Sequence, residues 1–390
     1  MNVNTFYAEH SITSFEEAQD FLGQEPYYLD LKQDRDLYRI SHIADKSDMT
    51  NEVVKSLSGL ILNVENISQI HYKGQKLSEQ VLLKEGEELQ LSDITTIDIN
   101  HWNSIKVKKL YDGSRIKLFY HTNQWIVSTS RCIDATKAYW NSNKSFYELF
   151  IDCIGDYDLN QLDINKCYTF IILHPENRIV LNYLEPSCIH ILTYDKTECK
   201  EVDDDINLPK PEECNFASFE DFINAVTDLD YTEPGYMLVD ENNNRVRVMS
   251  RKYEEVRNLK GNIPNMAKRF LQLRKIEPEK IPIFLQYYPE YTELYNNLER
   301  HIIYICNVIF QKYKVRRRQH RRVELSQIES DIHYRVHGLY LGLRQASNLT
   351  NTNIIRSITL DDITIIVNSL PINKIYQLLQ EYTIVLDESV

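Results

Sequence analysis

The sequence predicts an α+β protein whose first part contains antiparallel sheets and whose last part is helical. Short alternating or apolar segments dominate up to about residue 253, and longer amphipathic segments dominate after Pro264. Alternation with a period of two is typical of strands, whereas a period near 3.6 is typical of helices. The change of period near residue 260 therefore predicts two domains, 1–258 and 259–390.

The first domain should begin with a short helix, because Ser14 can cap it and Glu17 follows three residues later. Alternating segments then predict strands at 28–31, 37–40, 59–62, 116–120, 125–128 and 168–173. Helical periodicity returns at 145–153 and 218–229. The acidic, proline-containing stretch 201–213 predicts an exposed loop.

The second domain shows broad apolar helical faces. They are formed by Met266, Phe270, Leu273, Tyr291, Leu294, Tyr295, Leu298, Ile302, Ile305 and Ile309. Near the end of the chain, Thr359 can cap a helix that starts at Leu360. The domain is therefore expected to be all-helical.

The composition is that of an ordinary globular protein, with 43% apolar and 26% charged residues. A net charge of −13 requires any nucleic-acid binding to use a local basic surface. Seven scattered cysteines without metal-ligand spacing predict reduced thiols. The chain begins without an apolar signal core and contains no membrane-length apolar run, so a cytoplasmic protein without membrane contact is expected, and a viral factory is a candidate location.

The segment 109–114 reads Lys-Leu-Tyr-Asp-Gly-Ser. Asp112, Gly113 and Ser114 make it resemble the K-x-D-G signature of RNA ligases, DNA ligases and mRNA capping enzymes. In that family the lysine amine attacks the α-phosphate of a nucleotide. Leu110 stands at the lysine position, and its hydrocarbon side chain cannot form a phosphoramidate.

Four further segments resemble other motifs of this family, in the same order along the chain as in the ligases. They are 58–62, 168–180, 233–239 and 246–253, and the resemblance implies a strand at 177–180. Several polar positions are changed: Ser58 replaces an arginine, Ile171 or Ile172 replaces the acid that contacts the ribose, and Arg247 and Met249 replace lysines. The resemblance covers about residues 27–255 and implies a nucleotidyltransferase (RNA ligase-like) domain.

A further set of residues resembles ligase-like proteins of large DNA viruses that lack the nucleophilic lysine. The matching residues are Trp125, Ser128, Thr129, Ile133, Asp134, Ala135, Trp140, Ser145 and Phe146. This resemblance implies a retained fold whose chemistry has been abandoned. The expected function is therefore a catalytically inactive protein that binds an RNA end, a purine nucleotide or the mRNA 5′ cap, with no catalytic residue, metal or cofactor.

Two alternatives remain open from the sequence. Lys108 or Lys109 could replace the missing nucleophile after a register shift, which would give an active RNA ligase that needs ATP or GTP and magnesium. The chain could instead be a protein-binding scaffold in a viral transcription or translation complex, with the helical domain as its docking part.

The candidate nucleotide- and RNA-binding residues are Asp112, Ser114, Trp125, Arg131, Arg178, Arg247, Lys252, Lys314, Arg316, Arg317, Arg318 and Arg321. For Asp112, a relic of the pocket and a simple turn former are equally good interpretations. Asn177 and Arg178 are better explained as structural braces. Trp125, Trp140 and Tyr120 offer either stacking surfaces for a base or core packing.

The strongest local charge feature is the tract 312–322, with seven formal positive charges in eleven residues. This tract predicts contact with RNA or another polyanion; a basic linker, a localisation signal and docking of the acidic loop are the competing interpretations. His333 and His337 have the spacing of a helical metal pair, but the sequence around them offers no third ligand, so a packing role is expected.

Overall fold

In the computed structural model, residues 3–67, 69–74, 78–82, 93–203, 206–349 and 357–387 are described. The chain divides into two compact units, Met1–Asn258 and Leu259–Val390. The first unit is mixed α+β with predominantly antiparallel sheets, and the described part of the second is helical, so the predicted fold class is confirmed. Asp204 and Asp205 of the expected acidic loop lie outside the described residues.

The first sheet has the antiparallel order β1-β2-β3-β4. Its strands are β1 (Leu29–Asp34), β2 (Leu37–His42), β3 (Ile61–Asn63) and β4 (Ile70–Tyr72). Helices α1 (Val3–Glu9), α2 (Phe15–Leu22) and α3 (Glu52–Leu57) form one hydrophobic core with this sheet. Ser14 caps α2 as predicted, whereas α1 was not predicted.

The second sheet has the antiparallel order β11-β10-β9-β7-β8. Its strands are β7 (Ser114–His121), β8 (Gln124–Ser128), β9 (Lys166–Leu173), β10 (Ser187–Asp195) and β11 (Lys200–Val202). Helix α4 (Phe146–Ile154) covers one face, and Ser145 and Glu148 form its capping box. The other face packs against the first sheet through Leu37, Ile61, Tyr72 and Phe119.

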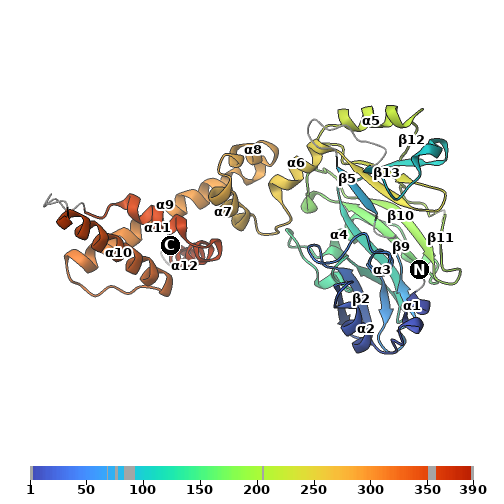
Figure 1. Cartoon of the computed structure of the whole chain (residues 1–390), viewed down its shortest axis with the longest axis horizontal. Helices are drawn as coiled ribbons and strands as arrows, with labels where there is room; N and C mark the ends of the chain where they lie inside the picture. The colour runs from blue at the N-terminus through green and yellow to red at the C-terminus, as the bar shows by residue number, and fades with distance from the viewer. Residues whose placement is uncertain are drawn as a thin grey trace. The chain divides into compact units, whose positions relative to one another are not determined.

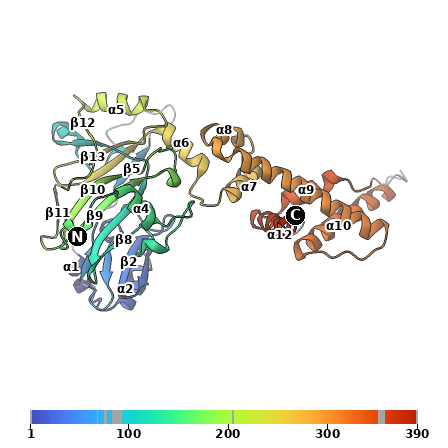
Figure 2. The same cartoon turned by 180° about the vertical axis from the view of Figure 1, so that it is seen from behind.

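The third sheet has the order β12-β6-β13-β14-β5. Its strands are β5 (Glu79–Leu82), β6 (Lys106–Lys109), β12 (Glu213–Cys214), β13 (Gly235–Val239) and β14 (Arg245–Met249). The β14–β5 pair is parallel, which departs from the expected antiparallel pattern. Helix α5 (Phe219–Asp228) covers one face of this sheet. Both views place α5 at the opposite end of the unit from α1 and α2 (Figures 1 and 2).

Short 3-10 helices join several of these elements. They are η2 (Ile99–Ser104), η3 (Ala135–Lys137), η4 (Leu159–Gln161) and η5 (Pro175–Asn177). After β14, the helix α6 (Arg251–Lys260) follows directly, so Lys252 and Tyr253 lie on a helix.

The second unit contains six further α-helices and the 3-10 helix η6 among its described residues. They are α7 (Met266–Ile276), α8 (Lys280–Tyr287), η6 (Pro289–Tyr291), α9 (Thr292–Arg318), α10 (Gln327–Leu349), α11 (Leu360–Ser369) and α12 (Ile372–Asp387). Met266, Phe270, Leu273 and Tyr295 are buried, as their helical spacing predicts. Thr359 forms a capping box with Asp362 and starts α11 at the predicted residue.

Candidate functional site

The ligase-like segment connects two different sheets. β6 ends at Lys109 in the third sheet, and β7 begins at Ser114 in the second. The connection passes very close to β9: a Cβ atom on Gly113 would lie 2.3 Å from the carbonyl oxygen of Ile172. Only glycine permits this approach without a shift of the backbone. The Asp-Gly pair therefore does not form a hairpin turn, which excludes that explanation of Asp112.

Asp112 is instead buried, and its side-chain hydrogen bonds connect three segments of the chain. Its side chain is 2% exposed, and its Oδ2 atom accepts hydrogen bonds from the backbone amides of Val180 at 2.9 Å and Leu181 at 2.6 Å. Its Oδ1 atom accepts a hydrogen bond from the Tyr253 hydroxyl at 2.5 Å. Burial, and then the nearby Asp112 carboxyl, raise the pKa of Tyr253 far above its ordinary value. Both carboxyl oxygens thus have partners within the fold.

The segment after β9 is held in an irregular conformation rather than a strand. Asn177 ends η5, and its Nδ2 atom donates to the Ser114 hydroxyl at 2.9 Å. The Arg178 Nε atom donates to the backbone carbonyl of Val180 at 3.0 Å. The expectation of a strand through Asn177–Val180 is therefore wrong, whereas the expected bracing contacts of Asn177 and Arg178 are present.

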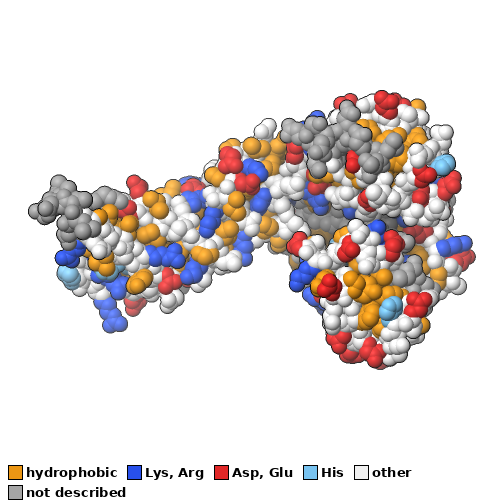
Figure 3. Space-filling view, viewed as in Figure 1, with side chains coloured by type: hydrophobic (Ala, Val, Ile, Leu, Met, Phe, Trp, Pro, Cys, Tyr) orange, Lys and Arg blue, Asp and Glu red, His pale blue; other side chains and the backbone are white. Residues whose placement is uncertain are grey.

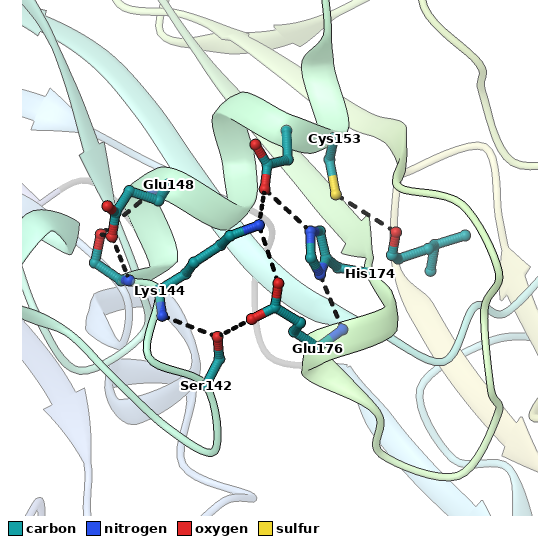
Figure 4. Close-up of polar contacts among 9 residues, drawn as sticks. Ser142, Lys144, Glu148, Cys153, His174 and Glu176 are labelled. Atoms are coloured by element: carbon teal, nitrogen blue, oxygen red, sulfur yellow. Dashed lines mark hydrogen bonds and ion pairs between the residues drawn. The ribbon is translucent and has the colours of Figure 1, made fainter.

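A polar network braces the start of this segment (Figure 4). The Lys144 Nζ atom lies 2.9 Å from Asp152 and 3.0 Å from Glu176. Ser142 donates to Glu176 at 2.6 Å, and His174 accepts from the Glu176 amide at 3.0 Å. Because Nδ1 of His174 is an acceptor there, its Nε2 carries the proton and faces Asp152 at 3.3 Å. The network holds η5 in place, and η5 positions Asn177 to hydrogen-bond Ser114.

Both candidate replacement lysines form ion pairs with glutamates next to or on β12. The Nζ atom of Lys108 lies 3.3 Å from Glu213, and that of Lys109 lies 2.8 Å from Glu212. The hydrogen bond that Lys109 donates to Glu212 raises the pKa of Lys109 above its ordinary value. A higher pKa lowers the fraction of neutral amine, which is the nucleophilic form.

The strand register places the two lysines on opposite faces of the third sheet. Lys109 pairs with Tyr236, whose side chain belongs to the core beneath α5. Lys108 pairs with Met237, which in turn pairs with Arg247. Because side chains alternate along a strand, Lys108 lies on the Arg247 face and Lys109 on the α5 face. Leu110 continues the alternation of Lys108, and its amide bonds the Gly235 carbonyl at 2.9 Å.

Three cations, Arg115, Lys117 and Arg247, form a group that we call the inner cation cluster. Arg115 and Lys117 alternate with the core residue Ile116 on β7, so they share the opposite face of the strand. Arg115 is close enough to lower the pKa values of both Lys117 and Arg247. No residue in the described part of the chain forms an ion pair with any member of the cluster.

Lys117 is the most buried member, with 4% exposure. Its Nζ atom donates to the Gly59 carbonyl at 2.9 Å and lies 5.0 Å from the ring centre of Tyr72. Burial, followed by the charges of Arg115 and Arg39, lowers the pKa of Lys117 to about 7. Arg39 is itself paired with Asp30, at 3.1 Å.

Arg247 provides the cluster with an unused donor. Its Nε atom is buried and has no hydrogen-bond partner in the described structure. Burial, and then the charges of Arg115 and Arg257, lower the pKa of Arg247 to about 10. Across β7 and β9, Arg115 pairs with Ile171, so Ile171 rather than Ile172 is the apolar residue on the cluster face. A buried donor without a partner is costly, and an anion at this face would satisfy it.

We expect Lys117→Met to raise the free energy of unfolding at pH 7 by about 1–4 kcal/mol, because it removes a buried cation that has no carboxylate partner. The ordinary pKa of lysine is about 10.4, so between pH 7 and 10 the unfolded chain keeps a proton that folded Lys117 loses. The free energy of unfolding of the wild type therefore gains about 1.4 kcal/mol per pH unit from Lys117 over this range.

Denaturant unfolding of the wild type and of Lys117→Met across this pH range measures the effect. The difference between the two curves isolates Lys117 from other titrating groups. It should be largest near pH 7 and shrink towards pH 10. A difference that does not change with pH would contradict the low pKa of Lys117.

The remaining candidates of the first unit are packed aromatic residues or exposed side chains. Trp125 on β8 packs edge-on against Tyr120, with 5.3 Å between ring centres, and lies 5.9 Å from Tyr168. Arg131 and Lys252 are exposed at the surface. Trp140 is 43% exposed. Trp125 therefore packs against the hydrophobic core between α4 and the second sheet.

In the second unit, Lys312 of the basic tract is not available to a ligand. Its Nζ atom contacts buried Glu329 at 2.7 and 3.0 Å, and the Tyr382 hydroxyl also donates to that carboxylate. Ser326 and Glu329 hydrogen-bond reciprocally at the start of α10. The signature Ser-x-x-Glu at 326–329 could have revealed this capping box from the sequence.

The rest of the tract is largely solvent-exposed. Lys314 lies over the ring of Phe310, at 4.4 Å from its centre. Arg316 and Arg317 are exposed in the last turn of α9, and Arg321 is exposed in the following loop. Arg318 ends α9, and its side chain is outside the described part.

His333 is buried between α9 and α10, where the Tyr313 ring packs edge-on against it at 5.7 Å. Among the described residues, no group of three or more His, Cys, Asp or Glu side chains has the arrangement of a metal site. Within the same residues, no helix combines the length and apolarity needed to cross a membrane.

Sequence reasoning missed Arg115 and Lys117. The available signal was their spacing: two cations alternate with Ile116 and Leu118 in the strand that follows the Asp-Gly-Ser segment. Such an alternation indicates one apolar face and one basic face.

The chain is similar in structure to ATP-dependent ligases. An archaeal ATP-dependent RNA ligase aligns over 70% of this chain and 68% of its own, with 9% identity and a TM-score of 0.41. A putative ATP-dependent DNA ligase from Aquifex aeolicus aligns over 78% of this chain and 79% of its own, with 15% identity and a TM-score of 0.41.

In sequence, the chain is similar to two viral proteins. It is 26% identical over 220 residues to an immediate-early protein ICP-46 homolog of Invertebrate iridescent virus 3, a match covering 54% of this chain and 49% of the relative. It is 22% identical over 269 residues to the immediate-early protein ICP-46 of Frog virus 3 (isolate Goorha), covering 59% of this chain and 67% of the relative. The chain thus spans about half the length of the first of these relatives. No family model matches the sequence.

Proposed function

We propose that the first unit binds the phosphates of an RNA 5′ end or of a purine nucleotide without forming a covalent bond to them. The observation that carries this proposal is the inner cation cluster. Arg115, Lys117 and Arg247 lie near one another without an ion pair to a carboxylate in the described structure, and the Arg247 Nε atom has no hydrogen-bond partner. Like charges at such a site repel, and a bound polyanion offsets both the repulsion and the unused donor.

The positions of the lysines argue against lysyl-nucleotide chemistry. Leu110 lies on the strand face that the attacking lysine would need, since it continues the alternation of Lys108. Lys109 lies on the face packed under α5, and its ion pair with Glu212 holds its amine in the charged form. The apolar Ile171 opposite Arg115 also removes the ribose-binding acid that the ligase resemblance implies.

An active ligase is the second candidate, and one observation favours Lys108 as its nucleophile. Lys108 shares the face of Arg247 and is separated from it by one strand, β13. Its ion pair with Glu213 would have to break first. A protein-binding scaffold is the third candidate; it predicts that RNA affinity is absent.

The test compares short RNAs that differ only at the 5′ end: triphosphate, monophosphate, hydroxyl and cap. The proposal predicts that the triphosphate or cap form binds more tightly than the hydroxyl form, and that Arg115→Gln or Arg247→Met abolishes this preference. Arg300→Gln, which changes an exposed arginine of α9, is the control. An affinity independent of the 5′ group in the wild type would contradict the proposal.

A further inference from the structure

The basic surface of the second unit carries an unusual excess of positive charge. Residues 312–344 include nine Lys and Arg residues but three Asp and Glu residues, in a chain whose net charge is −13. Two of these carboxylates are already paired: Glu329 with Lys312 and Asp331 with Lys374. Figure 3 shows Lys and Arg side chains gathered over this helical unit.

Four arginines of this surface are free to meet a polyanion. Arg316, Arg317, Arg321 and Arg322 are exposed, and none forms an ion pair with a described residue. Cations in the last turn of a helix also stabilise its dipole, which accounts for Arg316 and Arg317 in part. That effect does not extend to Arg321 and Arg322, because both lie beyond the end of α9.

The same surface presents an aromatic ring that the fold does not use. Tyr334 on α10 is 82% exposed, although the preceding residue, His333, is 3% exposed. Within the described structure, Tyr334 has neither a hydrogen bond nor an aromatic neighbour. Its phenol therefore offers an open face to an external group.

Tyr334 lies on the helix that packs against the end of α9, where Arg316 and Arg317 are located. Residues three apart on a helix are neighbours, so Tyr334 and His337 lie on one side of α10. The ring of Tyr313 on α9 packs edge-on against His333 on α10 at 5.7 Å, and Arg316 and Arg317 follow Tyr313 within about one helical turn, so the end of α9 packs against this part of α10. The His337 ring also stacks on Tyr340, with 6.2 Å between centres and 16° between planes.

We propose that this surface, made of Arg316, Arg317, Arg321, Arg322 and Tyr334, binds a single-stranded stretch of RNA, with the arginines on phosphates and an unpaired base stacked on Tyr334. Arginines alone would serve any polyanion, whereas an exposed ring beside them selects a ligand with aromatic faces. Bases in a duplex are already stacked, so an unpaired strand fits best. The inference rests on the proposed RNA-binding function, and it concerns a second, separate surface.

The test uses a short unstructured RNA with a 5′-hydroxyl end, so that the inner cation cluster has no terminal phosphate to bind. We expect Tyr334→Ala to weaken its binding by about 5- to 150-fold and Tyr334→Phe to leave it unchanged. Tyr139→Ala, which removes another tyrosine that is 56% exposed, is the matched control and should bind like the wild type. Circular dichroism verifies that each variant is folded.

Two further arms separate base stacking from charge. An abasic oligonucleotide of equal length should bind wild type and Tyr334→Ala equally. Arg316→Gln combined with Arg317→Gln should reduce the dependence of log affinity on log salt by about 0.7 for each phosphate that the variant no longer binds, whereas Tyr334→Ala should not change that slope.

Three results would overturn the inference: an unchanged affinity of Tyr334→Ala, an equal loss on the abasic strand, or binding of duplex RNA as tight as that of the single strand. Failure of the proposed function would appear in a different experiment. The RNA affinity of the wild type would not depend on the 5′ group, and the Arg115 and Arg247 variants would bind like the wild type.

Discussion

Asp112→Ala should lower the free energy of unfolding of the first unit by about 3 kcal/mol or more. The change leaves the amides of Val180 and Leu181 and the Tyr253 hydroxyl without their acceptor in a buried site. Each buried donor left unpaired costs about 1–3 kcal/mol. Chemical denaturation followed by a probe confined to the first unit measures this loss.

Matched variants make the expectation specific. Asp112→Asn keeps one oxygen for the two amides and should cost less than Asp112→Ala. Tyr253→Phe removes one of the three bonds and should cost about 1 kcal/mol. Asp45→Ala, at an exposed aspartate, should stay within about 0.5 kcal/mol of the wild type.

A variant of Asp112 also tests whether this residue only stabilises the fold or contacts the ligand. Because both its oxygens have partners within the fold, folded Asp112→Asn should bind RNA 5′ ends as the wild type does. A loss of binding without a loss of stability would show that Asp112 contacts the ligand, contrary to our interpretation.

Glu329→Ala should destabilise the second unit by about 3–5 kcal/mol, because it leaves the Lys312 ammonium without its counter-charge in a part-buried site. Glu329 is 2% exposed, and it connects α9, the start of α10 and α12 through Lys312, Ser326 and Tyr382. Thermal or denaturant unfolding of the second unit measures the change. Glu324→Ala, at an exposed glutamate of the preceding loop, is the control.

The same network predicts an acid-dependent loss of stability. Burial alone would raise the pKa of Glu329, but the hydrogen bonds from Lys312, Tyr382 and Ser326 outweigh it, and the pKa ends below its ordinary value. For an acid with a lowered pKa, the stabilisation is present above the unfolded pKa and is lost as the pH falls towards the folded one. Glu329→Gln should reduce the loss of unfolding free energy as the pH falls. If the free energy of unfolding of Glu329→Gln fell with acid as steeply as that of the wild type, Glu329 would not be the group responsible.

The sequence predicted those features whose causes are local. Ser14 and Thr359 cap helices as expected, because a cap and its helix lie within a few positions of each other. The strands at 116–120 and 168–173 were found for the same reason, since alternation and apolar runs are properties of a short window.

The features that the sequence did not predict depend on contacts between residues that are far apart in the chain. Asp112 meets Val180 and Tyr253, which are 68 and 141 positions away. These contacts explain the wrong strand at 177–180, because amides that would join a ladder bond the Asp112 carboxyl instead. The parallel pairing of β5 with β14 is equally non-local. The inner cation cluster was missed although Arg115 and Lys117 alternate within one strand.

The central claim is that the inner cation cluster binds a nucleotide phosphate while no amine of the chain attacks it. The most direct test incubates the protein with α-phosphate-labelled ATP or GTP and magnesium, and measures retained label before and after denaturation. The account predicts label retained by the native protein, lost on denaturation, and absent in Arg247→Met. Label that survives denaturation and disappears in Lys108→Ala, or no retention by the native protein at all, would contradict it.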